Sequence, residues 1–505
     1  MVSSTCSLSV YFLPKKAAEP STPLREAGTR RSRNRLSFYP TLKMENGIRP
    51  MADAKFAAFV HDHLHMFGDE ICRLATQPSV SARNEGVAEC ADLVVEMMER
   101  LGISTRVLRI KGAAPLVFGE LKASNSSKTI LFYNHYDVQP EQPVEEWRSK
   151  PFTPLVKEGR LYGRGVSDDK GELVSRLKLL EAYLSTAGEA PCTFKFCFEG
   201  EEEIGSPHLD EYVSQSPKLF QSDALFWEWG GVDELDRPVV QLGVKGMIYL
   251  ELVVKELASD AHSKNAAALP SAPWKLVRVL EAIKDAHEKI LVPGWYDRVE
   301  KLDEGELKIL DDEPFDAEGY KKTFGASEFA GGMSASRAKK SLAFGPTANI
   351  AGIWSGYTGE GTKTVLPREA RCKMDLRLVP NQDPEQLLWK FKQHLIDKGF
   401  KSVEVIAHQM VPPARTSSKS VLAQAAARAG EVVYGKKSVV RLSSAGVGPL
   451  YVFKRRYGMP SVSIGVSAPD SQIHAPNENL RLDLLEKGIL WLAETIDSFS
   501  RTTKE

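Results

Sequence analysis

Two stretches of alternating strand and helix patterns, separated by a region of another kind, most constrain the fold of this chain. From about residue 54 to 241, short apolar strand patterns alternate with amphipathic helix patterns, and the alternation resumes from about residue 413. Such alternation is typical of a largely parallel β-sheet covered by helices. Because 505 residues exceed one ordinary core, a domain interrupted by an insertion is the simplest arrangement.

The region between the two stretches has the pattern of a compact α+β unit. Paired strand patterns open it, a helix is predicted at about 273–290, and a Gly- and Asp-rich segment follows at about 290–345. Further strand patterns and a second helix close it, and two helices on one antiparallel sheet form a stable unit. The predicted fold class is therefore α/β, with a discontinuous main domain at 51–241 and 413–505 whose mostly parallel sheet is flanked by helices, and an inserted α+β domain at 242–412.

The first fifty residues differ in composition from the rest. The segment TRRSRNR at 29–35 holds four arginines, and the surroundings are rich in Ser, Thr and Pro with few acidic residues, so they cannot bury a core. We expect residues 1–50 to be a disordered leader. Two interpretations stay open, because residues 1–43 could be an organelle-targeting peptide, or translation could start at Met44 or Met51.

Charge, hydropathy and cysteine usage narrow the class of protein. Lys and Arg together number 66, as do Asp and Glu, so no overall field favours nucleic acid or an anionic membrane. No apolar run approaches the roughly 18 residues that a transmembrane helix needs. Six scattered cysteines without a CxxC pair indicate reduced thiols in a cytosol-like compartment. We expect a soluble, cytoplasmic protein with no nucleic-acid or membrane partner.

Two histidine patterns could bind metal. His61 and His65 share a helix face at i,i+4, but their segment is an ordinary amphipathic helix, so a metal site there is not favoured. In FYNHYDVQP, His135 and Asp137 follow an apolar strand, and alternation turns both side chains the same way. A carboxylate beside a ligand imidazole fixes its tautomer, although the same pair could be purely structural.

Two acidic motifs follow along the chain. In GRGVSDDKGE, Asp168 and Asp169 lie in a Gly-bracketed loop that opens a helix, which suits either an N-cap with a solvated neighbour or a bridging carboxylate. In FEGEEEIGS at 198–206, four glutamates directly follow a strand pattern. Taken alone, each motif could be a solvated acidic loop or a group of carboxylates in a catalytic or metal-binding site.

The order and spacing of these motifs resemble the M20 family of metallopeptidases, most closely its long-lid dipeptidases, the carnosinase-like and Cys-Gly dipeptidase group. The resemblance runs from about residue 55 to 500. It rests on HYD, GRGVSDDKG, EGEEEIGS, WEWGG and IHAPNEN, in that order. It implies that the discontinuous domain is catalytic and that the insert is a lid and dimerisation domain.

The resemblance also implies two divalent metal ions bridged by Asp168. His135 and Glu228 would complete the ligands of one ion, and Glu203 and His474 those of the other. Imidazole and carboxylate ligands suit Zn²⁺ best and also admit Mn²⁺ or Co²⁺. Two such ions can polarise a carbonyl and lower the pKa of a bound water towards neutrality.

Such a centre still needs a base that is not itself a ligand. Glu202, next to Glu203, fits this role, because it could take the proton of the water and later deliver it to the leaving amine. Asp137 joins it as the carboxylate that orients the ligand histidine. Glu199 and Glu201 have no catalytic task in this scheme, and we expect them to shape or solvate the turn.

Three further residues are expected to bind substrate by the same resemblance. His262 would reach the site of the partner subunit and stabilise the oxyanion, which implies a homodimer. Arg377 would pair with the free carboxylate of the substrate, assisted by Thr364. Where the family often has Gly-Ser-x-Pro, this chain has Gly446-Val447-Gly448-Pro449, and Val447 cannot donate a hydroxyl hydrogen bond.

The expected function is that of a dinuclear metallohydrolase that cleaves dipeptides or removes the C-terminal residue of short peptides. One alternative is an N-acyl amino acid deacylase of the same family, and another is a non-catalytic binding homologue. The long segment at 290–345 and GYTGEGTKTVLP favour the dipeptidase group. The presence of every ligand residue and of Glu202 argues against the binding homologue.

Overall fold

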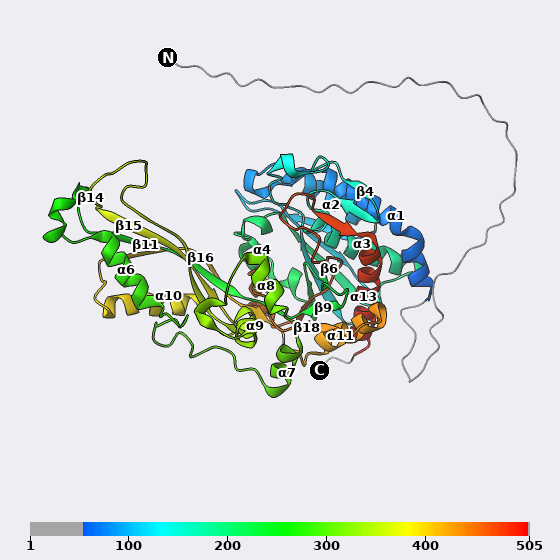
Figure 1. Ribbon diagram of the computed structural model, residues 1–505. Coiled ribbons are helices and arrows are strands. Elements are labelled where there is room, and N and C mark those ends of the chain that lie inside the picture. Colours follow the sequence, from blue (N-terminus) through cyan, green and yellow to red (C-terminus); the bar gives the residue numbers. More distant parts are fainter. Residues whose placement is uncertain (1–53, 125, 503–505) are drawn as a thin grey trace, which may run out of the picture. The chain divides into compact units, whose positions relative to one another are not determined.

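A computed structural model describes residues 54–124 and 126–502 (Figure 1). The leader predicted at residues 1–50 lies outside these residues. Among the helices of the described part, none is both long enough and apolar enough to cross a membrane.

A nine-stranded sheet organises the main domain (Figure 1). Its central strands β6, β3, β7 and β19 run parallel, and β1 and β2 continue it antiparallel at one edge. This mostly parallel sheet confirms the predicted α/β class. In spatial order the strands are β1 (Ser104–Leu108), β2 (Leu116–Leu121), β6 (Thr193–Glu199), β3 (Thr129–His135), β7 (Ala224–Trp227), β19 (Ser461–Ser463), β9 (Pro238–Gln241) and β18 (Val439–Arg441), with β8 (Gly231–Val232) paired to β9.

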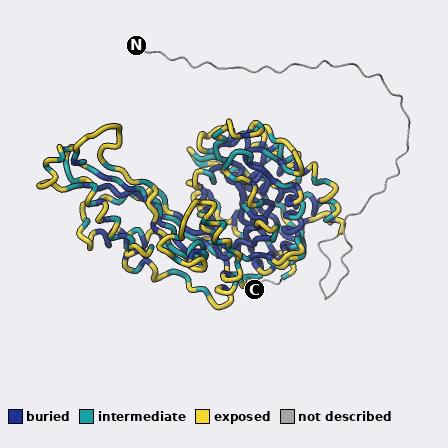
Figure 2. Tube along the Cα trace, viewed as in Figure 1, coloured by how far each residue is buried: buried dark blue, intermediate teal, exposed yellow. Residues whose placement is uncertain are grey.

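The central strands are buried on both faces, because helices cover each side of the sheet. Alternate residues of β3 enter two different cores, with Ile130 and Phe132 in one and Leu131 and Tyr133 in the other. Figure 2 shows this buried interior in dark blue. The first core is covered by α1 (Ala54–Thr76), α2 (Val87–Glu99), α3 (Lys170–Ala187), α11 (Val421–Tyr434) and α13 (Leu482–Ser500), and the second by α4 (Leu209–Gln215), α5 (Pro217–Phe220) and α12 (Tyr451–Tyr457).

A separate four-stranded antiparallel sheet lies within the predicted insert. Its order is β13 (Thr347–Ser355), β15 (Glu369–Leu378), β11 (Gly246–Lys255) and β16 (Glu404–Val411). Every second residue of β15 is buried, and these side chains share a core with α6 (Ala272–Ile283) and α10 (Pro384–Asp397). The domain boundaries at 241/242 and 412/413 remain predictions.

One expectation for the insert needs correction. The helix predicted at 273–290 ends at Ile283, because Lys284 pairs with Ile290 across a turn that the Asp285 carboxylate holds. The Gly- and Asp-rich segment at 290–345 is partly helical. It holds three short helices, α7 (Glu304–Asp312), α8 (Ala317–Phe324) and α9 (Ala335–Phe344), each with a side chain accepting a hydrogen bond at its N-terminus.

Short paired strands place the remaining segments that matter for the site. They are β4 (Leu155–Lys157), β5 (Arg160–Tyr162) and β20 (Asn479–Arg481) in one small sheet, β12 (Ala261–His262) with β14 (Val365–Leu366), and β10 (Gly243–Val244) with β17 (Ala414–Arg415).

Candidate metal centre

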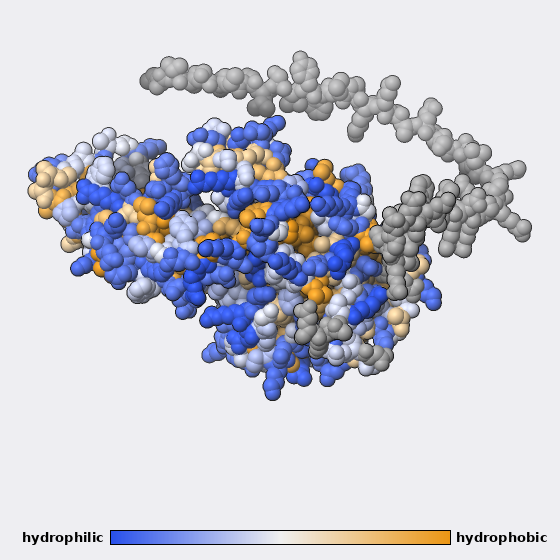
Figure 3. Space-filling view, turned by 90° about the horizontal axis from the view of Figure 1, so that it is seen from below, coloured by the Kyte–Doolittle hydropathy of each residue, from blue (hydrophilic) through white to orange (hydrophobic). Residues whose placement is uncertain are grey.

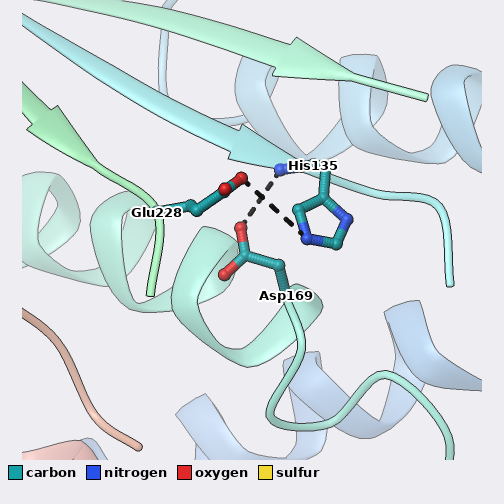
Figure 4. A group of neighbouring side chains, drawn as sticks. All are labelled: His135, Asp169 and Glu228. Carbon is teal, nitrogen blue, oxygen red and sulfur yellow. Dashed lines mark hydrogen bonds and ion pairs between the residues drawn. The ribbon is translucent and has the colours of Figure 1, made fainter. Parts of the chain in front are cut away.

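Four predicted site residues lie at or just beyond the carboxyl ends of adjacent parallel strands. β3 ends at His135, β6 ends shortly before Glu202 and Glu203, and β7 ends just before Glu228. Because these strands are parallel neighbours, their carboxyl ends meet at one edge of the sheet, where α/β proteins bind ligands. In Figure 4 the His135 ring and the Glu228 carboxylate face each other, with Nε2 and Oε2 4.0 Å apart.

Asp168 lies between two histidines. Its Oδ1 is 3.1 Å from Nε2 of His135, and its Oδ2 is 2.9 Å from Nε2 of His474. The same nitrogen of His474 is 3.2 Å from Oε2 of Glu203. Each oxygen of Asp168 therefore faces a different imidazole, which is the arrangement that a carboxylate bridging two cations requires.

The protonation equilibria of the two histidines reflect the surrounding carboxylates. Hydrogen bonds to Asp168 and Glu203 raise the pKa of His474 to about 10. Burial lowers the pKa of His135, but hydrogen bonds to Asp137 and Asp168 outweigh it, so its pKa lies well above the usual range. Both shifts indicate a site whose negative charge attracts cations.

Two carboxyl groups of the cluster resist ionisation in the metal-free protein, because they are buried and lie close to other carboxylates. Burial raises the pKa of Glu228 well above its usual range, and repulsion from Glu202 adds to this. Burial also raises the pKa of Glu202 to about 7, with His135 opposing and Glu203 adding. Buried carboxylates in this state are stabilised by a cation.

The donor set fits divalent metal ions. Oε1 of Glu203 and Oε2 of Glu228 are buried and accept no hydrogen bond from any residue within 54–124 or 126–502. Together with two imidazoles and the shared Asp168, these oxygens match the ligands that Zn²⁺ takes in proteins. The ligand atoms of His135, Asp168 and Glu203 all lie within 4.8 Å of one another.

Asp169 is a further candidate that the sequence interpretation did not assign to the site. With His135 and Glu228 it forms a second group whose ligand atoms lie within 4.8 Å (Figure 4). Its Oδ2 accepts hydrogen bonds from Nδ2 of Asn134 at 2.8 Å and from the backbone N of His135 at 3.1 Å. Asp169 thus fixes the end of β3, and its position next to Asp168 was the only signal in the sequence.

Asp137 contacts both His135 and the turn that carries the glutamates. Its carboxylate accepts hydrogen bonds from the backbone N of Glu202 at 3.2 Å and of Glu203 at 3.1 Å. Oδ1 is 3.4 Å from Nδ1 of His135, whereas the nearer partner of Nδ1 is the carbonyl oxygen of Asp137 at 3.0 Å. The residue therefore orients the imidazole mainly through its backbone.

Glu199 and Glu201 do not solvate the turn, so that part of the expectation is wrong. Both are buried. Oε2 of Glu199 accepts hydrogen bonds from the hydroxyls of Tyr133 and Ser206, and the Glu201 carboxylate lies 2.7 Å from Nδ1 of His208. Both glutamates hold the turn from the inside.

The three residues predicted to bind substrate lie in two places. His262 and Thr364 are exposed neighbours on β12 and beside β14, where the backbone N of Ser263 donates to the Thr364 carbonyl at 3.2 Å. Arg377 lies on β15 with its Nε 3.2 Å from Oδ1 of Asp375. Among the described residues, no hydrogen bond or ion pair joins these three to the candidate metal ligands.

Two adjoining cavities lie beside the centre. One, of about 980 Å³, is lined by Glu228 and by Val447 of the glycine-rich turn. The other, of about 1070 Å³, is lined by Lys245 and Arg377. Tyr320 lines both, so Arg377 faces a hollow next to the one that contains the metal-ligand candidate Glu228.

The N-terminal histidines belong to a different environment. Nδ1 of His61 lies 3.0 Å from the carboxylate of Glu486. In the described part of the chain, neither His61 nor His65 belongs to the two groups of side chains that could hold a metal ion.

The chain is similar to known proteins over most of its length. The model of peptidase family M20/M25/M40 matches residues 131–498. Over 448 residues the chain is 28% identical to the Cys-Gly metallodipeptidase dug1 of Schizosaccharomyces pombe, covering 84% of this chain and 93% of that protein. It is 27% identical over 382 residues to the Beta-Ala-His dipeptidase of Rattus norvegicus, covering 72% and 76%. An M20 family metallo-carboxypeptidase from Sulfolobus solfataricus superimposes with a TM-score of 0.79 and 36% identity, over 85% of this chain and 98% of that one.

Proposed function

The chain belongs to peptidase family M20/M25/M40, which confirms the predicted family, and from this premise we propose that it is a dinuclear metal-dependent dipeptidase. It would cleave the peptide bond of dipeptides or release the C-terminal residue of short peptides. The observation that carries this proposal is the pair of contacts made by Asp168, whose two oxygens face His135 and His474 separately. The similar proteins are a Cys-Gly metallodipeptidase, a Beta-Ala-His dipeptidase and a metallo-carboxypeptidase.

The proposed ligand sets come from the family resemblance, and the contacts of Asp168 with His135 and His474 support them. Asp168 would lie between two ions, with His135 and Glu228 at one and Glu203 and His474 at the other. The bound ions would polarise the scissile carbonyl and make a water acidic enough to lose a proton near neutral pH. Zn²⁺ suits these ligands best, and Mn²⁺ or Co²⁺ also fit.

Glu202 is the proposed general base. Its backbone N is held by Asp137 at 3.2 Å, next to the ligand candidate Glu203. Because burial raises the pKa of Glu202 to about 7, its carboxyl group can exchange a proton near neutral pH. It would accept the proton of the attacking water and donate it to the leaving amine.

Arg377 is the proposed partner of the C-terminal carboxylate of the substrate. Asp375 engages its Nε, and within the described part of the chain no hydrogen bond or ion pair engages its Nη groups. The cavity that Arg377 lines adjoins the one that contains Glu228, so a peptide could reach both. Val447, which lines the cavity of Glu228, offers the substrate an apolar side chain in place of a hydroxyl.

A homodimer in which His262 serves the neighbouring site is part of the proposal. His262 is exposed, and its Nδ1 accepts a hydrogen bond only from the nearby Lys264 N within the described residues. Hydrophilic residues cover most of the face seen in Figure 3, whereas edge strand β13 exposes Ile350 (45%), Ile353 (53%) and Trp354 (43%). An edge strand with exposed apolar side chains favours pairing with another chain.

A cytoplasmic location is also proposed. Five cysteines of the described part, Cys72, Cys90, Cys192, Cys197 and Cys372, are free thiols. Reduced thiols are typical of the cytosol.

A substrate panel tests the function. Purified protein loaded with Zn²⁺, Mn²⁺ or Co²⁺ would be assayed on dipeptides and tripeptides, and in parallel on N-acetyl and N-succinyl amino acids. Hydrolysis of dipeptides is the expected result. Activity on acyl amino acids alone would support the deacylase instead, and protein that holds no metal would support a binding homologue.

A further inference from the structure

Glu478 is a fully buried carboxylate without a role in the chemistry proposed above. Its Oε1 accepts hydrogen bonds from the backbone N–H groups of Ser167 and Asp168, each at 2.9 Å. Its Oε2 accepts one from the backbone N of Gly165 at 2.9 Å and one from Nη1 of Arg164 at 2.8 Å. All four donors belong to the loop that ends at Asp168, so one carboxylate fixes the backbone of the bridging residue.

The same residue is tied to the segment that carries His474. Strand β20 begins directly after Glu478, and it pairs antiparallel with β5, which leads into the loop of Asp168. The backbone carbonyl of Glu478 also accepts a hydrogen bond from the N of Gly163 at 3.0 Å. His474 lies four residues before Glu478, so one pair of strands anchors both segments: the loop of Asp168 leaves β5, and the segment of His474 runs into β20.

Arg164 extends this connection to a third segment. Its side chain is buried, and its Nη2 donates a hydrogen bond to the carbonyl of Pro140 at 3.1 Å. The guanidinium lies 5.3 Å from the centre of the Trp147 ring. Pro140 belongs to the loop that follows β3, shortly after His135. Arg164 therefore connects Glu478 to the loop behind the buried histidine.

The chemistry of this position requires a carboxylate. An ionised carboxylate only accepts hydrogen bonds, and its two oxygens can accept all four donors. A glutamine would turn its amide hydrogens either towards the N–H groups of Ser167 and Asp168 or towards Gly165 N and Arg164 Nη1, and both orientations leave donors without acceptors. A buried ion pair such as Glu478 with Arg164 is costly compared with apolar packing. Its presence therefore indicates a role in fixing the geometry of the loop.

We infer that Glu478, paired with Arg164, is a positioning residue that holds Asp168 and His474 in register and so sets the affinity of the centre for its metal ions. The inference rests on the proposed function, because it assumes that ions bind at this cluster. Loss of an outer partner of metal ligands lowers metal affinity by about 10- to 100-fold.

The test is a titration of metal-free protein with Co²⁺, followed by the visible absorption of the bound ion. The variant E478Q keeps the size of the side chain, and E306Q is its matched control. Glu306 is likewise buried and paired with a buried arginine, Arg415, but it contacts none of the proposed ligands. We expect E478Q to bind Co²⁺ about 10- to 100-fold more weakly with an altered spectrum, and E306Q to bind like the wild type.

The outcomes separate this inference from the function on which it rests. If the wild type binds no Co²⁺, the proposed dinuclear centre is wrong. If the wild type binds Co²⁺ and E478Q binds it with the same affinity and spectrum, the positioning role is wrong and the function stands. Equal weakening in E306Q also overturns the role, because affinity would then follow general stability.

A second variant covers the case in which E478Q does not fold, as judged by circular dichroism. R164K keeps the positive charge but cannot contact Glu478 and Pro140 at once with the planar fork of arginine. Weaker Co²⁺ binding with an altered spectrum is expected for R164K. A folded R164K that binds Co²⁺ like the wild type overturns the inference.

Discussion

Oδ2 of Asp168 lies 2.9 Å from Nε2 of His474, although the two residues come from distant segments of the chain. The other oxygen of Asp168 lies 3.1 Å from Nε2 of His135. The two histidines differ in exposure, since the side chain of His135 is 2% exposed and that of His474 is 52% exposed. The centre therefore has a buried half and an open half that share one carboxylate.

This asymmetry predicts different metal contents for two variants. D168N should hold neither ion through dialysis, because the bridging charge is lost to both. H474A should keep one ion, because His135 and Glu228 remain at the buried half. Elemental analysis of dialysed, Zn²⁺-loaded protein measures the number of ions per chain.

A surface histidine provides the control for this experiment. His408 is 42% exposed and lies 3.4 Å from Glu251, so it resembles His474 in exposure and in having an acidic partner. H408A should keep both ions. Equal metal contents in D168N and H474A would contradict the shared role of Asp168.

Glu202 should matter for the rate and not for metal binding. E202Q cannot accept a proton, so we expect kcat to fall at least ~10²-fold while the metal content stays unchanged. The neighbouring variant E201Q is the control, since the Glu201 carboxylate contacts Ala114 N and His208 and should affect stability more than rate. Turnover of E202Q close to that of the wild type would exclude the base.

The strands that carry the site could be predicted because their pattern is local. The run at 129–135 is almost wholly apolar up to Asn134, as expected of a parallel strand buried on both faces. Since parallel strands end at one edge of the sheet, the meeting of His135, Glu203 and Glu228 follows from the strand order alone. The contact between Asp168 and His474 does not follow from the strand order. It was expected only because of the family resemblance.

What could not be predicted depends on partners far away in the chain. The charges of Glu199 and Glu201 predict exposure to solvent, but Tyr133 and Ala114, which are distant in the sequence, donate hydrogen bonds that make the burial of these carboxylates possible. The helices α7 to α9 are only eight to ten residues long, and few of their residues are buried, so the sequence has no long apolar stripe that would indicate them. The role of Glu478 needs the pairing of β5 with β20, which no local pattern indicates.

Arg377 should determine the binding of peptides with a free C-terminus. Lysine keeps the charge but loses the two-pronged contact, so R377K should raise KM about 10-fold or more with little change in kcat. A peptide amide should bind the wild type and R377K equally poorly. Steady-state kinetics on each peptide and its amide measure this.

Arg371 is a matched control on the same strand. Its side chain is 30% exposed, against 34% for Arg377, and it pairs with Glu251 and Glu369. R371K should leave KM unchanged. If R377K still distinguishes the acid from the amide as strongly as the wild type, Arg377 does not bind the carboxylate.

His262 should act on the site of the other subunit. Mixed dimers of H262A and E202Q should contain one complete site, because the H262A chain keeps Glu202 and receives His262 from its partner. Such heterodimers, separated by two affinity tags, should show about half of the wild-type turnover, as expected when one of two symmetric sites works. Heterodimers as inactive as the two parent variants would indicate that His262 acts within its own chain.

Glu199 should make the stability of the metal-free protein depend on pH. Burial raises the pKa of Glu199 to about 8, against the opposing hydrogen bond from Tyr133. Below about pH 4.5 the carboxyl group of Glu199 is protonated in both the folded and the unfolded protein. As the pH rises from there to about 8, the unfolded chain loses this proton first, so the contribution of Glu199 to stability is progressively lost.

The side chain at position 199 in E199Q stays neutral at every pH and keeps an acceptor for the Tyr133 hydroxyl. This variant should therefore not lose stability through residue 199 as the pH rises. The free energy of unfolding of E199Q relative to the wild type should therefore rise between pH 5 and pH 8, by roughly 1.4 kcal/mol for each pKa unit of the shift. Urea unfolding of chelator-treated protein at several pH values measures this difference. Parallel pH profiles for the two proteins would mean that Glu199 is already ionised in the folded protein, with its charge balanced by a group other than Tyr133 or Ser206.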